Sequence, residues 1–226
     1  MWPLLDIKID RIIRSRRRTI SLEVTPDAAL VIRAPIFATK SYIEKVVGNK
    51  AAWIISKQQD AMSRCRKYPF KSYTDGEMFW FLGKGCKLEF TQEVEEPEVK
   101  DDRLCLPEKL RGNTQAAVTG WYRAQALRVV TLRVKLYSRV TGLEYKSVKI
   151  SGAKKRWGSC GSNNTLNFSW RIVMAPLRVI DYVVIHELAH TQHHDHSKAF
   201  WAKVLEIMPD YQTQKQWLAE NSGLLR

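Results

Sequence analysis

Two histidines and a glutamate stand at a spacing that suits metal chemistry. Residues 179–190 contain His186, Glu187 and His190 as H-E-x-x-H, within an apolar helical periodicity that begins after Pro176. Four residues make just over one helical turn, so the two imidazoles project from one face and could share a metal ion. Glu187 is offset by one position, which predicts a general base beside an attacking water. The pattern therefore predicts a zinc-dependent hydrolase.

A third ligand must be sought downstream, because catalytic zinc usually takes three protein ligands and leaves one position open. His193, His194 and His196 are the candidates. The first two would lie on or near the continuing helix, whereas the chain is expected to turn near His196, before an amphipathic segment that starts around Phe200 and stops at Pro209. A ligand from the opposite side of the metal is easier to supply after a turn, so we predict His196.

The clustering of the histidines argues against a chance match. All five fall between positions 186 and 196, which random placement along 226 residues would very rarely produce. A histidine-rich helix end that binds metal only adventitiously is the alternative. Cys160 could ligate as a thiolate, but three histidines complete a catalytic set, so we interpret this cysteine as structural.

The elements expected around the motif indicate the α+β class. Period-two alternation over residues 7–32 predicts a short antiparallel meander, and residues 41–62 predict a helix with Thr39 or Ser41 as its N-cap. A second hairpin is expected at 78–90 with its turn at 83–85, then a long helix over 114–140 that ends at Gly142. Strands at 148–150 and 166–170 precede the histidine-bearing helix.

An acidic stretch at 93–102, which contains Pro97, predicts an exposed connection. We therefore expect a β-rich N-terminal region over residues 1–105, an antiparallel sheet with a helix. A zincin-like catalytic region with the H-E-x-x-H helix is expected over 106–226.

Composition sets the wider context. A formal net charge of +14 is compatible with nucleic acid, an acidic substrate or simple solubility, and the run Arg14-Ser15-Arg16-Arg17-Arg18 fits a solvated hairpin turn as well as a phosphate-binding patch. The four cysteines show no paired spacing, the first residues lack a secretory pattern, and no apolar run approaches the roughly 20 residues of a membrane span. A cytoplasmic protein without membrane contact is expected, whereas its oligomeric state is open.

Several segments together resemble the YgjP-like metallopeptidases, which are related to the SprT group of zinc proteases. The resemblance is dense over residues 148–205 and is carried by Arg156-Trp157-Gly158-Ser159-Cys160, Asn167 before Trp170-Arg171, Ala175-Pro176, residues 180–184, H-E-L-A-H at 186–190 and residues 196–201. Shorter matches occur at Arg16-Arg17-Arg18-Thr19, Arg33-Ala34-Pro35 and Asp75-Gly76-Glu77. The family pattern implies that His186, His190 and His196 hold zinc and that Glu187 is catalytic.

Peptide or protein hydrolysis is the leading interpretation, with an extended substrate added to the strand at 166–170 if that strand is an edge. One alternative is a metal-dependent pyrophosphatase of nucleotides such as UTP, a role also attached to YgjP-like proteins, although no G-x-x-x-x-G-K phosphate loop is present. The other is a nucleic-acid-associated protease or a nucleic-acid-binding protein. A binding protein with a structural metal is disfavoured by three histidines beside a glutamate, since structural zinc sites are normally closed by four ligands. Nucleic-acid binding and hydrolysis could coexist.

Four further side chains have open roles. Arg156 and Trp157 could line a cleft, but burial is the commoner fate of a tryptophan at a strand end. Asp181 and Asp195 could accept hydrogen bonds from ligand imidazoles, or could equally lie on the surface.

Overall fold

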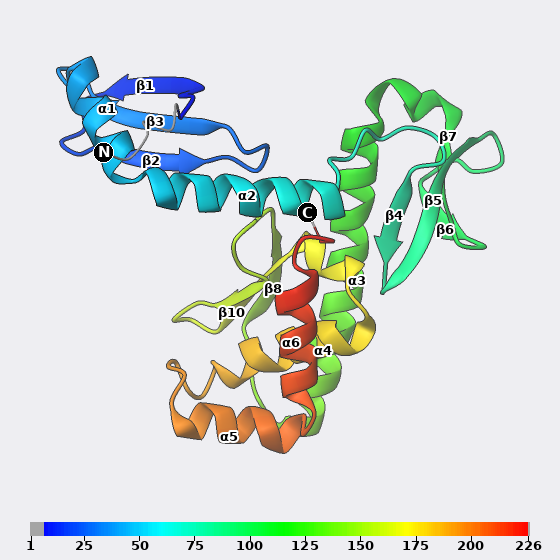
Figure 1. Ribbon diagram of the computed structural model, residues 1–226. Helices are drawn as coiled ribbons and strands as arrows, with labels where there is room; N and C mark the ends of the chain where they lie inside the picture. Colours follow the sequence, from blue (N-terminus) through cyan, green and yellow to red (C-terminus); the bar gives the residue numbers. More distant parts are fainter. Residues whose placement is uncertain (1–6, 226) are drawn as a thin grey trace. The chain divides into compact units, whose positions relative to one another are not determined.

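Small sheets and helices alternate along the chain in the computed structural model, which describes residues 7–225 and has a mixed α+β architecture (Figure 1). Two compact units divide between Phe70 and Lys71. The sequence suggested a soft boundary near residue 105, and the assignment of residues 106–226 as a catalytic region stays a prediction.

The first unit begins with a three-stranded sheet of β1 (Arg11–Ser15), β2 (Ser21–Val24) and β3 (Leu30–Pro35). Its order is β1-β3-β2, with β1 parallel and β2 antiparallel to β3. The expected antiparallel meander is therefore wrong for β1, and residues 16–20 pass from one side of β3 to the other rather than forming a hairpin turn.

Side chains explain the parallel pairing of β1, which alternation alone could not reveal. Asp10 accepts a hydrogen bond from the Leu30 amide at 2.7 Å, and its own amide donates to the Leu30 carbonyl at 3.1 Å. At the other end of β1, the Arg14 guanidinium donates to the carbonyls of Pro35, Ile36 and Ala38 at 3.3, 3.0 and 2.7 Å. These contacts fix both ends of β1 along β3.

The helical segment that follows is two helices, α1 (Lys40–Asn49) and α2 (Ala51–Lys67), rather than the single one expected. Thr39 is the N-cap of α1, as predicted, and its hydroxyl accepts from the Tyr42 amide at 3.2 Å. Lys50 leaves helical geometry at φ −112°, just after Gly48, the residue with the weakest helix propensity in the segment.

The second unit contains two further sheets. The four-stranded sheet has the order β4-β5-β7-β6, formed by β4 (Met78–Phe81), β5 (Lys84–Thr91), β7 (Arg103–Pro107) and β6 (Glu98–Lys100). The expected hairpin is β4 and β5, but its turn lies at Leu82 and Gly83 rather than at 83–85, because Lys84 and Gly85 already pair with β4. The acidic connection is partly ordered, because β6 pairs antiparallel with β7.

The smaller sheet has the order β8-β10-β9, formed by β8 (Ser147–Ser151), β10 (Thr165–Ser169) and β9 (Gly158–Cys160). Strand β10 is central, parallel to β8 and antiparallel to β9. The idea that residues 166–170 form an exposed edge is therefore wrong, and β9 takes an edge position instead.

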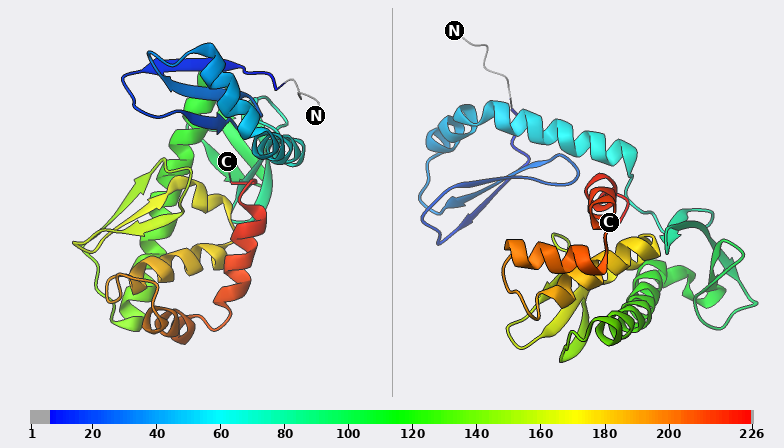
Figure 2. Two further views of the ribbon diagram at one scale, coloured as in Figure 1. Left: turned by 60° about the vertical axis from the view of Figure 1, so that its left-hand side comes forward. Right: turned by 90° about the horizontal axis from the view of Figure 1, so that it is seen from below.

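The remaining elements of this unit are helical: η1 (Glu108–Asn113), α3 (Thr114–Thr141), η2 (Trp170–Met174), α4 (Leu177–Ala189), α5 (Lys198–Ile207) and α6 (Tyr211–Asn221). Helix α3 ends as predicted at Gly142, which adopts a left-handed φ of 71°. Helix α4 contacts α3, α5, α6 and β9, and the left panel of Figure 2 shows it between the small sheet and α6 (red).

Helix α4 is the most enclosed helix of this unit. Ile180, Val184 and Leu188 are fully buried, and Val183 and Ile185 nearly so. Burial of each such side chain stabilises the fold by about 1.5–3 kcal/mol. This enclosure explains why residues 179–185 are apolar except for Asp181 rather than apolar along one stripe, and it makes α4 a rigid support for His186 and Glu187.

The start of α4 is held by the β4-β5 hairpin. The amides of Leu82 and Gly83 donate to the carbonyls of Val173 and Met174 at 2.9 and 3.1 Å. Gly83 has a φ of 81°, and a Cβ at this position would come within 2.9 Å of the Pro176 Cα. Only glycine satisfies both the backbone conformation and the close approach.

The structure also bears on the expected membrane spans and on the state of the cysteines. Among residues 7–225, no helix is long and apolar enough to cross a membrane. All four cysteines are free thiols.

Candidate metal centre

The end of α4 and the start of α5 bring the histidines together. His190 is the C-cap of α4, and the chain then turns through the His193 amide, which donates to the Ala189 carbonyl at 3.0 Å. Asp195 accepts from the Ser197 amide at 3.2 Å, and Ser197 caps α5. The turn therefore falls immediately around His196, where the sequence placed it.

His186, His190 and His196 form one cluster whose ligand-capable atoms all lie within 4.8 Å of one another. The Nε2 atoms of His186 and His196 are 3.2 Å apart. Two nitrogens bound to one tetrahedral zinc at about 2.1 Å would be about 3.4 Å apart, so the spacing fits a shared ion.

The orientation of His190 is fixed by the backbone of His193. The Nδ1 of His190 lies 2.9 Å from the His193 carbonyl oxygen. Because a carbonyl oxygen can only accept, Nδ1 carries the proton and Nε2 keeps a lone pair for a metal. His193, a candidate ligand in the sequence, thus acts through its main chain, and His194 is exposed outside the cluster.

His186 is held in the neutral, metal-binding form. Burial, with the neighbouring His190 and His196, lowers the pKa of His186 to about 3. Burial also lowers the pKa of His190. Neutral imidazoles are the form that binds metal. The Nδ1 of His186 is buried without a hydrogen-bond partner among the described residues.

Aromatic rings of α5 pack against the three imidazoles, and the sequence analysis did not predict these contacts. Phe200 is fully buried and its ring centroid lies 4.4 Å from that of His190 and 4.9 Å from those of His186 and His196. Trp201 stacks on His196 at 5.7 Å. The helical periodicity of the apolar residues after His196 predicts that Phe200 and Trp201 are buried. It does not predict that their rings contact the imidazoles.

Glu187 is buried beside the cluster, with 5% of its surface exposed. Burial raises its pKa to about 8, and the positive charge of Arg156 partly opposes the shift. A cation held by the histidines would oppose it further, because opposite charge favours the carboxylate. The wall against Glu187 is Gly158 of β9, where a Cβ would come within 2.5 Å of Glu187 Oε1.

Other residues singled out in the sequence lie as follows. Trp157 is half-buried and packs against the core, whereas Arg156 is exposed. Cys160 is half-buried, and burial together with Glu187 raises its thiol pKa.

Asp181 is buried in a bidentate ion pair with Arg133, at 2.5 and 2.8 Å. Neither Asp181 nor Asp195 accepts from an imidazole among the described contacts.

Three imidazoles that converge beside a buried carboxylate are a donor set that fits a catalytic metal. The model for the YgjP-like metallopeptidase domain matches residues 18–221, most of the chain. The chain belongs to the YgjP-like metallopeptidases. As a member of this family it is a hydrolase that works with a metal ion, and the histidine triad is a cluster that could hold one.

Two further comparisons accompany this YgjP-like assignment. No curated protein matches the chain. The crystal structure of the metallopeptidase zymogen of Pyrococcus abyssi abylysin is 19% identical, with a TM-score of 0.37, over 40% of this chain and 93% of that one.

Proposed function

We propose that the protein hydrolyses peptide bonds with zinc held by His186, His190 and His196 and with Glu187 as general base. The observation that carries the proposal is the convergence of three imidazoles around one point, next to a carboxylate that makes no ion pair in the described residues. This is the donor set of catalytic rather than structural zinc sites.

Bound zinc would act as a Lewis acid and would lower the pKa of a water bound to it to roughly 7. The chain's own groups then handle the protons. Glu187 accepts a proton from the attacking water and returns it to the amine that leaves when the peptide bond breaks. Its burial and its contact with Gly158 hold the carboxylate in place without an ion pair among the described residues.

Strand β9 is the surface that suits an extended substrate. It lies at an edge of the small sheet, with β10 on its other side. A peptide added along this edge would gain main-chain hydrogen bonds with little demand on its sequence. Because Gly158 of β9 lies against Glu187, a peptide paired there would pass beside the proposed base.

Activity against an unfolded protein such as casein tests the proposal. The chelated protein should be inactive, and one equivalent of zinc should restore cleavage. A parallel incubation with nucleoside triphosphates supplies the contrast. Release of pyrophosphate without any peptide cleavage would overturn the peptidase assignment while leaving a metal hydrolase in place.

A further inference from the structure

A cavity lies within the unit that begins at Lys71, apart from the histidine cluster. Its volume is about 290 Å³, at the small end of ligand pockets, and neither Glu187 nor any of the three histidines lines it. Its walls come from the segment before β4, from β4, from the first turns of α3 and from η2.

Aromatic rings form much of the wall. Tyr122 of α3 and Trp170 of η2 stack with centroids 5.5 Å apart and planes 23° apart. The Tyr122 hydroxyl donates to the Trp80 carbonyl at 2.7 Å, so its ring is fixed. Tyr73 and Phe79 also line the cavity, with their centroids 5.7 Å apart. Tyr122, Phe79 and Trp170 are buried, whereas Tyr73 is half-buried, so Tyr73 is the one of these four rings that is open to a planar ligand.

Two arginines reach this cavity, and both lie at Gly152. The Arg171 guanidinium stacks over Trp170 at 4.2 Å and donates to the Gly152 carbonyl at 3.2 Å. A Cβ at Gly152 would lie 3.2 Å from Arg123 Nη2. Neither arginine forms an ion pair with a carboxylate in the part of the chain that the structure describes.

The positive charge of Arg171 is disfavoured by its surroundings. Burial lowers the pKa of Arg171, which Tyr73 partly opposes and the like charge of Arg123 reinforces. Two like charges at the wall of one cavity are stabilised by an anion between them. Guanidinium groups bind carboxylate and phosphate oxygens through paired hydrogen bonds, which gives such a site geometric selectivity.

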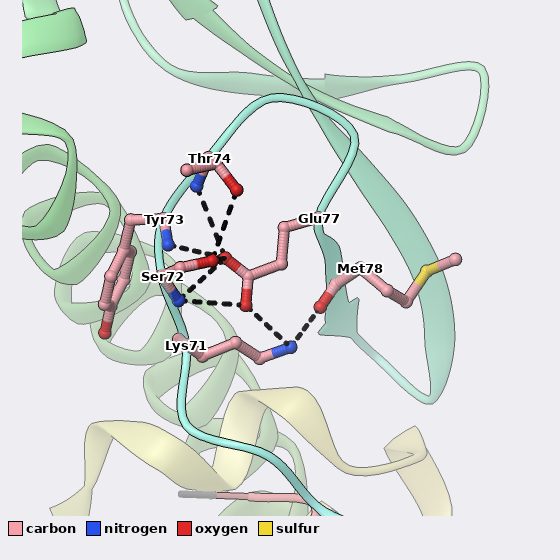
Figure 3. A network of polar contacts seen from close by, with 6 residues as sticks. All are labelled: Lys71, Ser72, Tyr73, Thr74, Glu77 and Met78. Atoms are coloured by element: carbon pink, nitrogen blue, oxygen red, sulfur yellow. Dashed lines mark hydrogen bonds and ion pairs between the residues drawn. The ribbon is translucent and has the colours of Figure 1, made fainter.

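Glu77, the acidic side chain beside Tyr73, is bound by other groups (Figure 3). The Glu77 carboxylate accepts from the amides of Ser72, Tyr73 and Thr74, at 3.0, 2.5 and 3.4 Å, and lies 3.7 Å from the Lys71 ammonium. It therefore does not neutralise the arginines.

This network also holds Tyr73 at a φ of 57°, in the left-handed region that non-glycine residues rarely adopt. Figure 3 shows the Tyr73 ring turned away from the Glu77 carboxylate. A strained backbone that is held by a partly buried carboxylate and presents one aromatic ring to a cavity indicates a functional constraint there. Two motif segments that are not part of the metal centre are therefore associated with this cavity. Trp170-Arg171 lines it, and Glu77 of Asp75-Gly76-Glu77 holds the backbone of Tyr73, which also lines it.

We propose that this cavity binds a small ligand made of a flat aromatic ring and one anionic group, with the ring beside Tyr73 and the anion between Arg123 and Arg171. The anionic group is a carboxylate or a phosphate ester.

Calorimetric titration of the zinc-loaded protein tests the site, with phenylacetate and phenyl phosphate as probes. One of the two should bind with 1:1 stoichiometry, at least tenfold more tightly than inorganic phosphate, which lacks the ring, and than benzyl alcohol, which lacks the charge. The comparison of the two probes distinguishes a carboxylate from a phosphate ester.

Arginine variants locate the binding. Arg123→Gln should weaken the better probe about tenfold or more, because a charge-assisted contact is lost. Arg123 is exposed on α3, so this variant should fold even if Arg171→Gln does not. Arg128→Gln is the matched control, since Arg128 is exposed on the same helix outside the cavity.

Three results would overturn the proposal: no saturable binding of either probe, binding unchanged in Arg123→Gln, or an equal loss in Arg128→Gln. A probe bound at the metal centre would give the second result, so the two sites are distinguishable.

Discussion

Gly158 of β9 lies directly against the Glu187 side chain of α4. A Cβ at Gly158 would come within 2.5 Å of Glu187 Oε1 and 2.6 Å of its Cγ, closer than such atoms approach one another. The absence of a side chain at this one position therefore defines where the Glu187 carboxylate can lie, and it joins the edge of the small sheet to the proposed base.

Gly158→Ala should abolish most activity while metal binding persists. The added methyl group meets the flexible end of Glu187, so the carboxylate moves more readily than the strand, and misplacement by about 1 Å can cost about 100-fold in rate. We expect zinc content near one per chain with kcat reduced by about that factor. Gly120→Ala, where the added atom meets nothing within 4 Å, is the control and should be fully active. Normal activity in Gly158→Ala would contradict the role given to this contact.

The ligand assignment predicts different outcomes for the downstream histidines. His196→Ala should lose most of its zinc affinity and all hydrolysis. His194→Ala should keep its zinc because His194 is outside the cluster, and His193→Ala should keep it because the main-chain carbonyl that orients His190 remains. Atomic emission on dialysed protein measures each case. Zinc retained by His196→Ala but lost from His193→Ala or His194→Ala would show that the third ligand is wrongly assigned.

The support under the start of α4 can be tested at Gly83. Gly83→Ala combines a left-handed backbone, which costs about 1–2 kcal/mol, with a clash 2.9 Å from the Pro176 backbone. Gly76→Ala is the matched control, since Gly76 has a similar φ of 79° but open space around it. Urea unfolding should show a clearly larger loss of stability for Gly83→Ala. Equal losses would mean that backbone strain alone matters.

The ion pair between Arg133 and Asp181 should stabilise the packing of α3 on α4. Arg133→Met leaves a buried carboxylate without its partner, which typically costs about 3–5 kcal/mol for a fully buried pair. Arg133 keeps 24% side-chain exposure, so a loss near the lower end is expected. The double variant Arg133→Met, Asp181→Leu removes both charges and should recover much of the stability. Thermal unfolding that leaves the single variant unchanged would contradict this.

The sequence predicted the histidine cluster because the local helix period and a single turn determine it. His186 and His190 are one turn apart, and His196 needs only a chain reversal that Ser197 caps. The long helix over 114–140 was predicted equally well, since its periodicity and Gly142 are local signals.

Contacts between distant segments were beyond sequence reasoning. Alternation indicates which residues of a strand face the core, but it does not identify the neighbouring strand, so the parallel pairing of β1 and the central place of β10 were missed. Asp181 was left open for the same reason, because its partner Arg133 lies 48 residues away.

The central claim separates metal binding from proton transfer, and Glu187→Ala tests it most directly. Zinc content and casein cleavage should be measured on one preparation of this variant beside the unmodified protein. The account predicts about one zinc per chain in both proteins and cleavage by the unmodified protein alone, because Glu187 removes a proton but does not hold the metal. Undiminished cleavage by zinc-loaded Glu187→Ala would contradict it.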